Sequence, residues 1–162
     1  MTRIVLVPGV LALLPEYAGV ADPVADLRAA CLEAVSSLGN EVTVVGETQG
    51  ERVAAYLLAA TLRNFDEASV LVVGNGSARR TEKAPGHLDE RADTFDADLG
   101  RVLRAGDTDA LRDLDRDLAA DLLAVVGPIA ALAGLLPAGA RGEMLYDDDP
   151  FGVKYWVMRW DR

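Results

Sequence analysis

The first half of the chain alternates between short apolar runs and segments whose apolar residues recur every three or four positions. Three runs rich in β-branched residues, Ile4–Val7, Val42–Val45 and Val70–Val73, are typical of buried strands. The segments between them, 22–39 and 51–65, have the spacing of amphipathic helices. This βαβαβ order predicts an α/β fold with a parallel sheet and right-handed crossovers.

Residue types at the segment ends support these boundaries. Asp22 and Pro23 suit the cap and first turn of a helix, and Gly39 with Asn40 suits its end. The residues that we expect to face the core are Val24, Leu27, Ala30, Cys31, Ala34, Val35 and Leu38 in the first helix and Val53, Leu57, Leu58 and Leu62 in the second.

The second half of the chain has a different pattern. Aspartate and arginine fill the segment 88–121, while Phe95, Leu99, Val102 and Leu103 form an apolar helical stripe. We interpret these charges as a solvated face with weak ion pairs, and we expect Asp107 or Thr108 to cap the next helix.

An uncharged segment, 122–140, follows and predicts a buried apolar helix. The glycines and prolines inside it argue against a membrane span. Two strands, 141–146 and 152–160, then form a hairpin around the turn residues 147–151. We expect this hairpin to be partly buried on both faces.

Composition narrows the class of protein. The 162 residues fit a single domain spanning 1–162, and 51% hydrophobic with 26% charged residues is typical of a globular chain. The net charge of −10 argues against nucleic acid and anionic membranes as partners. Pro8 and Gly9 interrupt the first apolar run, so we interpret it as a strand in preference to a signal peptide, and we expect a cytoplasmic protein. Cys31 is the single cysteine and is interpreted as a buried, inert thiol.

The strongest indication of a functional site is the loop that follows the third strand. Its residues are Gly74, Asn75, Gly76, Ser77, Ala78, Arg79 and Arg80. Ligands of open α/β sheets bind at the carboxyl ends of strands, and two glycines there suggest a sharp loop. Backbone amides, a hydroxyl and two guanidinium groups favour an anionic ligand, with Arg79 and Arg80 pairing to a carboxylate or phosphate. Pairing of these arginines with nearby acids is the alternative.

Two further features bear on the same predicted site. His87 is the only histidine, and we add it to the predicted ligand site because it lies close to the loop in the sequence. Asp147, Asp148 and Asp149 are the densest acidic cluster; turn composition explains them, and we include Asp148 among the ligand-binding residues. One histidine excludes a two-histidine metal site within one subunit, and we predict no bound metal.

A family resemblance rests on residues 70–115 and 145–160, which contain GNGSARRTEKAPGHLDE and LYDDDPFGVKYWVMRW. The chain resembles the B-subunit-like class III extradiol ring-cleaving dioxygenases, in an actinobacterial branch of that superfamily. The resemblance implies a three-layer α/β/α sandwich around a largely parallel or mixed sheet. It also implies Fe(II) held by two histidines and a carboxylate, with a further histidine in a glycine-rich turn as acid–base catalyst.

This sequence departs from that pattern. Residues 7–11 and 48–63 contain no histidine, and Ala78 follows Ser77 in the turn. We therefore expect no Fe(II) cofactor and no ring cleavage, but a protein that binds a small anionic ligand or a protein partner and forms a homo-oligomer. The alternatives are a divergent metal-dependent enzyme using Asp147, Asp149 and His87, and an accessory subunit that docks through its apolar helix and aromatic tail.

Overall fold

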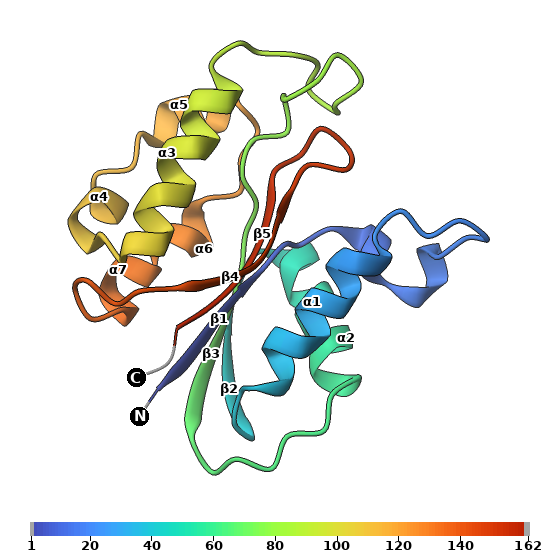
Figure 1. Cartoon of the computed structure of the whole chain (residues 1–162), viewed down its shortest axis with the longest axis vertical. Helices are drawn as coiled ribbons and strands as arrows, with labels where there is room; N and C mark the ends of the chain where they lie inside the picture. The colour runs from blue at the N-terminus through green and yellow to red at the C-terminus, as the bar shows by residue number, and fades with distance from the viewer. Residues whose placement is uncertain (1, 161–162) are drawn as a thin grey trace.

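A five-stranded mixed sheet organises the chain, whose computed structural model describes residues 2–160 (Figure 1). The strands are β1 (Arg3–Val7), β2 (Glu41–Val45), β3 (Ala68–Val73), β4 (Glu143–Asp148) and β5 (Tyr155–Trp160), in the spatial order β2-β3-β1-β5-β4. The first three strands are mutually parallel through β3, and β5 pairs antiparallel with both β1 and β4. The predicted α/β class is confirmed, with a mixed sheet.

Helices lie on both faces of this sheet (Figure 1). The longer ones are α1 (Ala25–Ser36), α2 (Thr48–Ala59) and α3 (Ala92–Ala105), and the shorter ones are α4 (Thr108–Arg112), α5 (Arg116–Asp121), α6 (Gly127–Ala130) and α7 (Leu132–Leu135). Two short 3₁₀ turns, Leu11–Leu13 and Pro15–Tyr17, follow β1.

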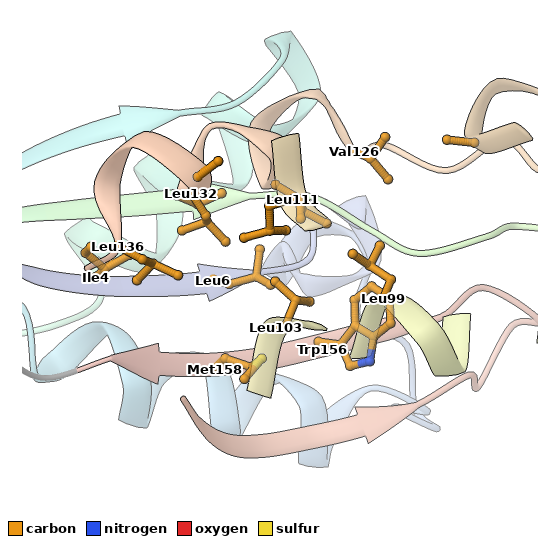
Figure 2. Packing of buried hydrophobic residues seen from close by; sticks show 14 of the residues in the cluster. Ile4, Leu6, Leu99, Leu103, Leu111, Val126, Leu132, Leu136, Trp156 and Met158 are labelled. Atoms are coloured by element: carbon orange, nitrogen blue, oxygen red, sulfur yellow. The ribbon is translucent and has the colours of Figure 1, made fainter. Parts of the chain in front are cut away.

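Successive side chains of each strand point to opposite faces of the sheet, so the core forms two clusters, one on each face. Val5 and Val7 of β1 pack with α1 and α2, whereas Ile4 and Leu6 pack with α3 to α7. Figure 2 shows Leu6, Leu99, Leu103 and Trp156 converging in the second of these clusters. Because successive side chains of a strand point to opposite faces, an all-apolar strand such as β1 requires cover on both sides.

The hand of the crossovers differs from the prediction. The connection through α1 passes from β1 over β3 to β2, and the connection through α2 returns from β2 to β3. Both helices pack on the same face. Two crossovers that run in opposite directions along one face have opposite hands, so the expectation of right-handed crossovers throughout is wrong for one of them.

The second helix begins and ends earlier than predicted. It spans Thr48–Ala59, and Leu62 is 94% exposed instead of facing the core. The Arg63 guanidinium donates to the Leu58 carbonyl, and the Asn40 amide donates to the Phe65 carbonyl. The first bond satisfies a carbonyl near the end of α2, and both hold the chain as it turns toward β3. The apolar spacing that continues to Phe65 therefore does not correspond to helix.

The predicted apolar helix over 122–140 is also wrong as a single helix. The segment contains only two short helices, α6 and α7, although most of its leucines and Ile129 are buried. Leu123 has a φ of 57°, and Val125 forms an isolated β-bridge with Asn75. Pro128 lies in the first turn of α6, where proline is tolerated. Leu136 leaves the helical region before Pro137, because proline disfavours helix in the residue before it.

The predicted hairpin is confirmed as β4 and β5. Tyr155, Trp156 and Trp160 are at most 3% exposed, so the aromatic tail belongs to the core and offers no docking surface. The homo-oligomer stays a prediction, without this tail as its interface. No helix within residues 2–160 is both long and apolar enough to cross a membrane.

Candidate functional site

The backbone amides of the loop 74–80 already donate within the protein. Gly74, Asn75 and Gly76 donate to the carbonyls of Val7, Val125 and Lys154 at 2.9–3.1 Å. Further along, the amides of Ser77, Ala78 and Arg80 donate to the Asp96 carboxylate and to the carbonyls of Leu122 and Gly152. These six N–H groups are therefore not available to cradle an anion.

The two glycines of the loop allow close packing. A Cβ on Gly74 would lie 2.7 Å from Ile129 and 2.8 Å from the Val125 carbonyl oxygen. A Cβ on Gly76 would lie 2.7 Å from both Asp96 and Lys154. The loop is thus an extended segment threaded between α6 and the hairpin, and the expectation of a sharp turn at this point is wrong.

Asp96 of α3 ties this loop to the helix layer. Its carboxylate, 1% exposed, accepts from the Ser77 amide at 2.8 Å, the Ser77 hydroxyl at 2.5 Å and Arg80 at 2.9 Å. A buried carboxylate is tolerated when hydrogen bonds and a cation satisfy it, as here. Ser77 is fully buried, and its hydroxyl donates to the Asp96 carboxylate that Arg80 also contacts, so we interpret it as a structural donor that holds the loop on α3.

Arg80 continues the network to the hairpin. Its guanidinium donates to Asp149 at 2.7 Å and lies 3.2 Å from Asp93. Burial opposes the charged form, but the hydrogen bonds from Arg80 to Asp149 and Asp96 outweigh it and leave the Arg80 pKa raised. Three carboxylates thus surround the one guanidinium.

Arg79 and His87 also have partners inside the protein. The Arg79 side chain donates to the carbonyls of His87 and Asp121 and lies 3.8 Å from Asp89. The pairing of Arg79 with Asp89 agrees with the alternative prediction that the arginines pair with nearby acids. His87 is exposed at a φ of 59°, with Nδ1 3.2 Å from the Glu82 carbonyl oxygen. A ligand role for these residues stays a prediction.

The three aspartates of the hairpin point to different partners. Asp149 contacts Arg80, and Asp147 pairs with Lys154 at 2.5 Å and Arg104 at 2.8 Å. Burial alone would raise the Asp147 pKa, but the bonds to Lys154 and Arg104 lower it overall. Asp148 is exposed and accepts from the Asp149 amide, so it is not the member that reaches the loop.

No group of three or more histidine, cysteine or carboxylate side chains suited to holding a metal ion occurs among residues 2–160. The predicted alternative set of Asp147, Asp149 and His87 is not gathered into such a group. Cys31 is buried between α1 and the sheet, and burial raises the pKa of its thiol, which keeps it in the unreactive protonated form.

A different pocket lies where the sheet topology favours a ligand. β1 and β3 are adjacent and parallel, but the chain leaves β1 toward α1 on one face and leaves β3 toward α3 on the other. Such a topological switch point opens a crevice beyond the carboxyl ends of the two strands. A cavity of about 110 Å³ occupies this position.

We call this cavity the switch-point pocket. It is lined by Gly9, Glu47, Gln49, Gly50, Val73, Gly74, Asn75 and Val125.

Two carboxamides bracket Gly9 at one wall of the switch-point pocket. The Gly9 amide donates to Asn75 Oδ1 at 2.9 Å, and the Gly9 carbonyl accepts from Gln49 Nε2 at 2.6 Å. Because Gly9 N–H is a donor, it fixes the Asn75 oxygen toward itself and turns the NH₂ group away. Within the described chain that NH₂ group has no partner, so it is free to donate to a ligand.

The N-terminus of α2 forms a second wall. Its cap residue Glu47 makes no side-chain capping bond, and the first amides of a helix have no intrahelical acceptor. Gln49 and Gly50, in this first turn, line the pocket. The helix dipole places partial positive charge here, while the exposed Glu47 carboxylate is an acceptor at the rim.

Close packing at Val73 holds α2 in this position. A Cβ on Gly50 would lie 2.9 Å from Val73, and one on Gly46 would lie 3.3 Å from it. Glycine at both positions lets the first turn of the helix approach the end of β3. The sequence pattern alone did not identify Gly9, Glu47, Gln49 or Gly50, although glycines after each of the three parallel strands were a usable signal.

Comparison with known proteins adds no identity: neither a family model nor a curated protein matches the chain.

Proposed function

We propose that this protein binds a small ligand through an anionic group in the switch-point pocket, without oxidative chemistry. The observation that carries the proposal is the convergence of a free Asn75 NH₂ group and the uncapped N-terminus of α2 on one cavity. Both supply hydrogen-bond donors, and helix N-termini favour anions.

The pocket's size limits the ligand class. A volume of about 110 Å³ accommodates a compact oxyanion such as a carboxylate or phosphate group, with the rest of the molecule outside. The Glu47 carboxylate and the unused Gln49 oxygen are acceptors, so a hydroxyl or amine beside the anionic group suits the rim. We therefore favour a small hydroxylated or aminated acid, or its phosphate ester.

The family resemblance supports the same location. The segments in which it implies histidines, 7–11, 48–63 and the turn containing Ala78, contribute Gly9, Gln49, Gly50, Gly74 and Asn75 to or beside one pocket. In this chain these segments hold no histidine, and what they contribute to the pocket is glycine backbone and carboxamide groups, which bind by hydrogen bonding. We infer a dioxygenase-like scaffold whose site has retained binding and lost ring cleavage.

Thermal unfolding in matched salts tests the proposal. At equal ionic strength and pH, inorganic phosphate or acetate should raise the Tm relative to chloride. At ten times the dissociation constant the stabilisation is about 1.4 kcal/mol, which corresponds to a rise of about 3–5 °C.

Two variants locate the effect. Asn75→Asp keeps the acceptor for Gly9 but replaces the free donor by negative charge, so it should abolish the rise. Arg79→Ala removes a cation of the loop 74–80 and should leave the rise intact. Loss of the effect in Arg79→Ala alone would move the anion site to that loop, and the absence of any effect in the parent protein would refute the proposal.

A further inference from the structure

A larger apolar groove lies between α3 and the segment that carries α4 and α5. Its volume is about 580 Å³. The apolar part of its lining is Phe95, Leu99, Val102, Ala110, Leu114 and Leu118. Val102, Leu114 and Leu118 are only partly buried and lie at the margin of the hydrophobic core. The groove therefore exposes apolar surface that the chain itself does not cover.

The groove follows the direction of α3. Thr94, Asp98 and Val102 line it at four-residue spacing, so they lie along one face of the helix. The rise of 1.5 Å per residue makes this stretch roughly 12 Å long. An elongated apolar groove of two turns matches the apolar stripe of an amphipathic helix.

Acidic side chains surround this apolar floor. Glu90, Asp98, Asp113 and Asp115 line the groove, against Arg91 as the single cation there. Arg91 is paired with Asp89 at 2.8 Å and lies 3.6 Å from Asp121. In the described chain, Glu90 and Asp113 have no ion-pair partner, so their charges are uncompensated.

The segment 89–121, which carries the groove, is acidic as a whole. Residues 89–121 contain eleven acidic and five basic side chains, which is more than half of the chain's net charge of −10. A second copy of the protein would bring an equally acidic face to the groove, and like charges oppose that contact. The complementary occupant is apolar on one side and basic at its flanks.

We propose that the α3–α5 groove is the docking site for a basic amphipathic helix of a partner protein. Leucine-like side chains at positions i, i+3 or i+4, and i+7 of that helix would contact Phe95, Val102 and Leu118. Its lysines or arginines would face Glu90, Asp98 and Asp113. This site is separate from the switch-point pocket and does not depend on the ligand proposed there.

A peptide titration tests this directly. The probe is a helical peptide of leucine and lysine, about 14 residues or four turns long, with its leucines on one face. Its control has glutamate in place of lysine. The lysine peptide should bind the full-length protein in fluorescence anisotropy, more weakly as salt rises, and the glutamate peptide should not bind.

Charge-matched variants separate docking from general attraction to an acidic protein. Asp98→Lys with Asp113→Lys should weaken binding at least about tenfold. Glu41→Lys with Asp66→Lys makes the same change in net charge away from the groove and should leave the affinity within about twofold. Val102→Asn, which changes no charge, should also weaken binding, and its circular dichroism verifies folding.

Four outcomes would overturn the proposal. They are absence of peptide binding, equal loss in both double variants, no effect of Val102→Asn in a folded protein, and self-association through the groove. The last is detected by size-exclusion chromatography as a dimer that Asp98→Lys with Asp113→Lys alters and Glu41→Lys with Asp66→Lys does not.

Discussion

Asp96 shows how far a residue's role depends on its place in the fold. The aspartates and arginines of residues 88–121 read as a solvated face, and pairs such as Arg101 with Asp98 and Arg112 with Asp109 fit that description. Asp96 does not, because helical spacing places it beside Leu99 and Leu103 on the buried face of α3. The residue type of Asp96 does not indicate that it is buried, whereas its position in the helical repeat does.

The first prediction concerns this carboxylate. In Asp96→Asn an amide NH₂ group replaces one carboxylate oxygen, so a donor faces the donors of Ser77 or Arg80. Arg80 also loses the most buried of its negatively charged partners. The free energy of unfolding should fall by about 3 kcal/mol, since breaking a buried ion pair costs that order. The urea midpoint, compared at unchanged m value, measures it.

Asp109→Asn is the matched control, because its exposed pair with Arg112 should contribute less than about 1 kcal/mol. Equal midpoints for Asp96→Asn and the parent protein would show that the network around Ser77 is not structural.

Elements were predictable where local pattern and tertiary packing agree. The three parallel strands and the β4–β5 hairpin occur close to their predicted positions, and Asp107 caps α4 by accepting from the Ala110 amide. The pattern failed where tertiary bonds decide the backbone. Arg63 closes α2 before Leu62, and the bridge between Val125 and Asn75 interrupts the apolar segment 122–140.

The second prediction concerns the seating of α2 on β3. Gly50→Ala would improve helix propensity, but its Cβ would approach Val73 to 2.9 Å. Overpacking of this kind costs about 1–3 kcal/mol and should exceed the gain of about 1 kcal/mol in propensity. We expect a lower Tm and a weaker response to phosphate, because the helix N-terminus must move away from the pocket.

Gly134→Ala is the control for propensity alone. Gly134 lies in α7 with no atom within 4 Å of the new Cβ, so this variant should be stabilised by about 0.5–1 kcal/mol. Stabilisation of both variants would show that close packing at Val73 is not needed.

The position of the switch-point pocket depends on the topology of the whole sheet. Strand order and the face on which each helix packs are non-local, so the sequence did not reveal that β1 and β3 send the chain to opposite faces. It did direct attention to the carboxyl end of β3, and Gly74 and Asn75 of the predicted site line the switch-point pocket. The rest of the predicted loop is occupied by internal hydrogen bonds and ion pairs.

Charge is distributed unevenly over the molecule. The acidic α3–α5 surface and the donor-lined switch-point pocket are different features of one chain with net charge −10. An anion therefore approaches against the overall field, and the local donors must provide its binding. Salt screens this field, so the affinity for simple anions should rise with the concentration of an inert salt. The rise should end where the anion of that salt competes for the same pocket.

An NMR titration of the ¹⁵N-labelled protein with inorganic phosphate shows where along the chain an anion binds. If it binds in the switch-point pocket, we expect saturable shifts concentrated at the amides of Gln49 and Gly50 and at the side-chain NH₂ of Asn75. Shifts confined to Arg79, Arg80 and His87, or no saturable shift anywhere, would show that the pocket does not bind anions.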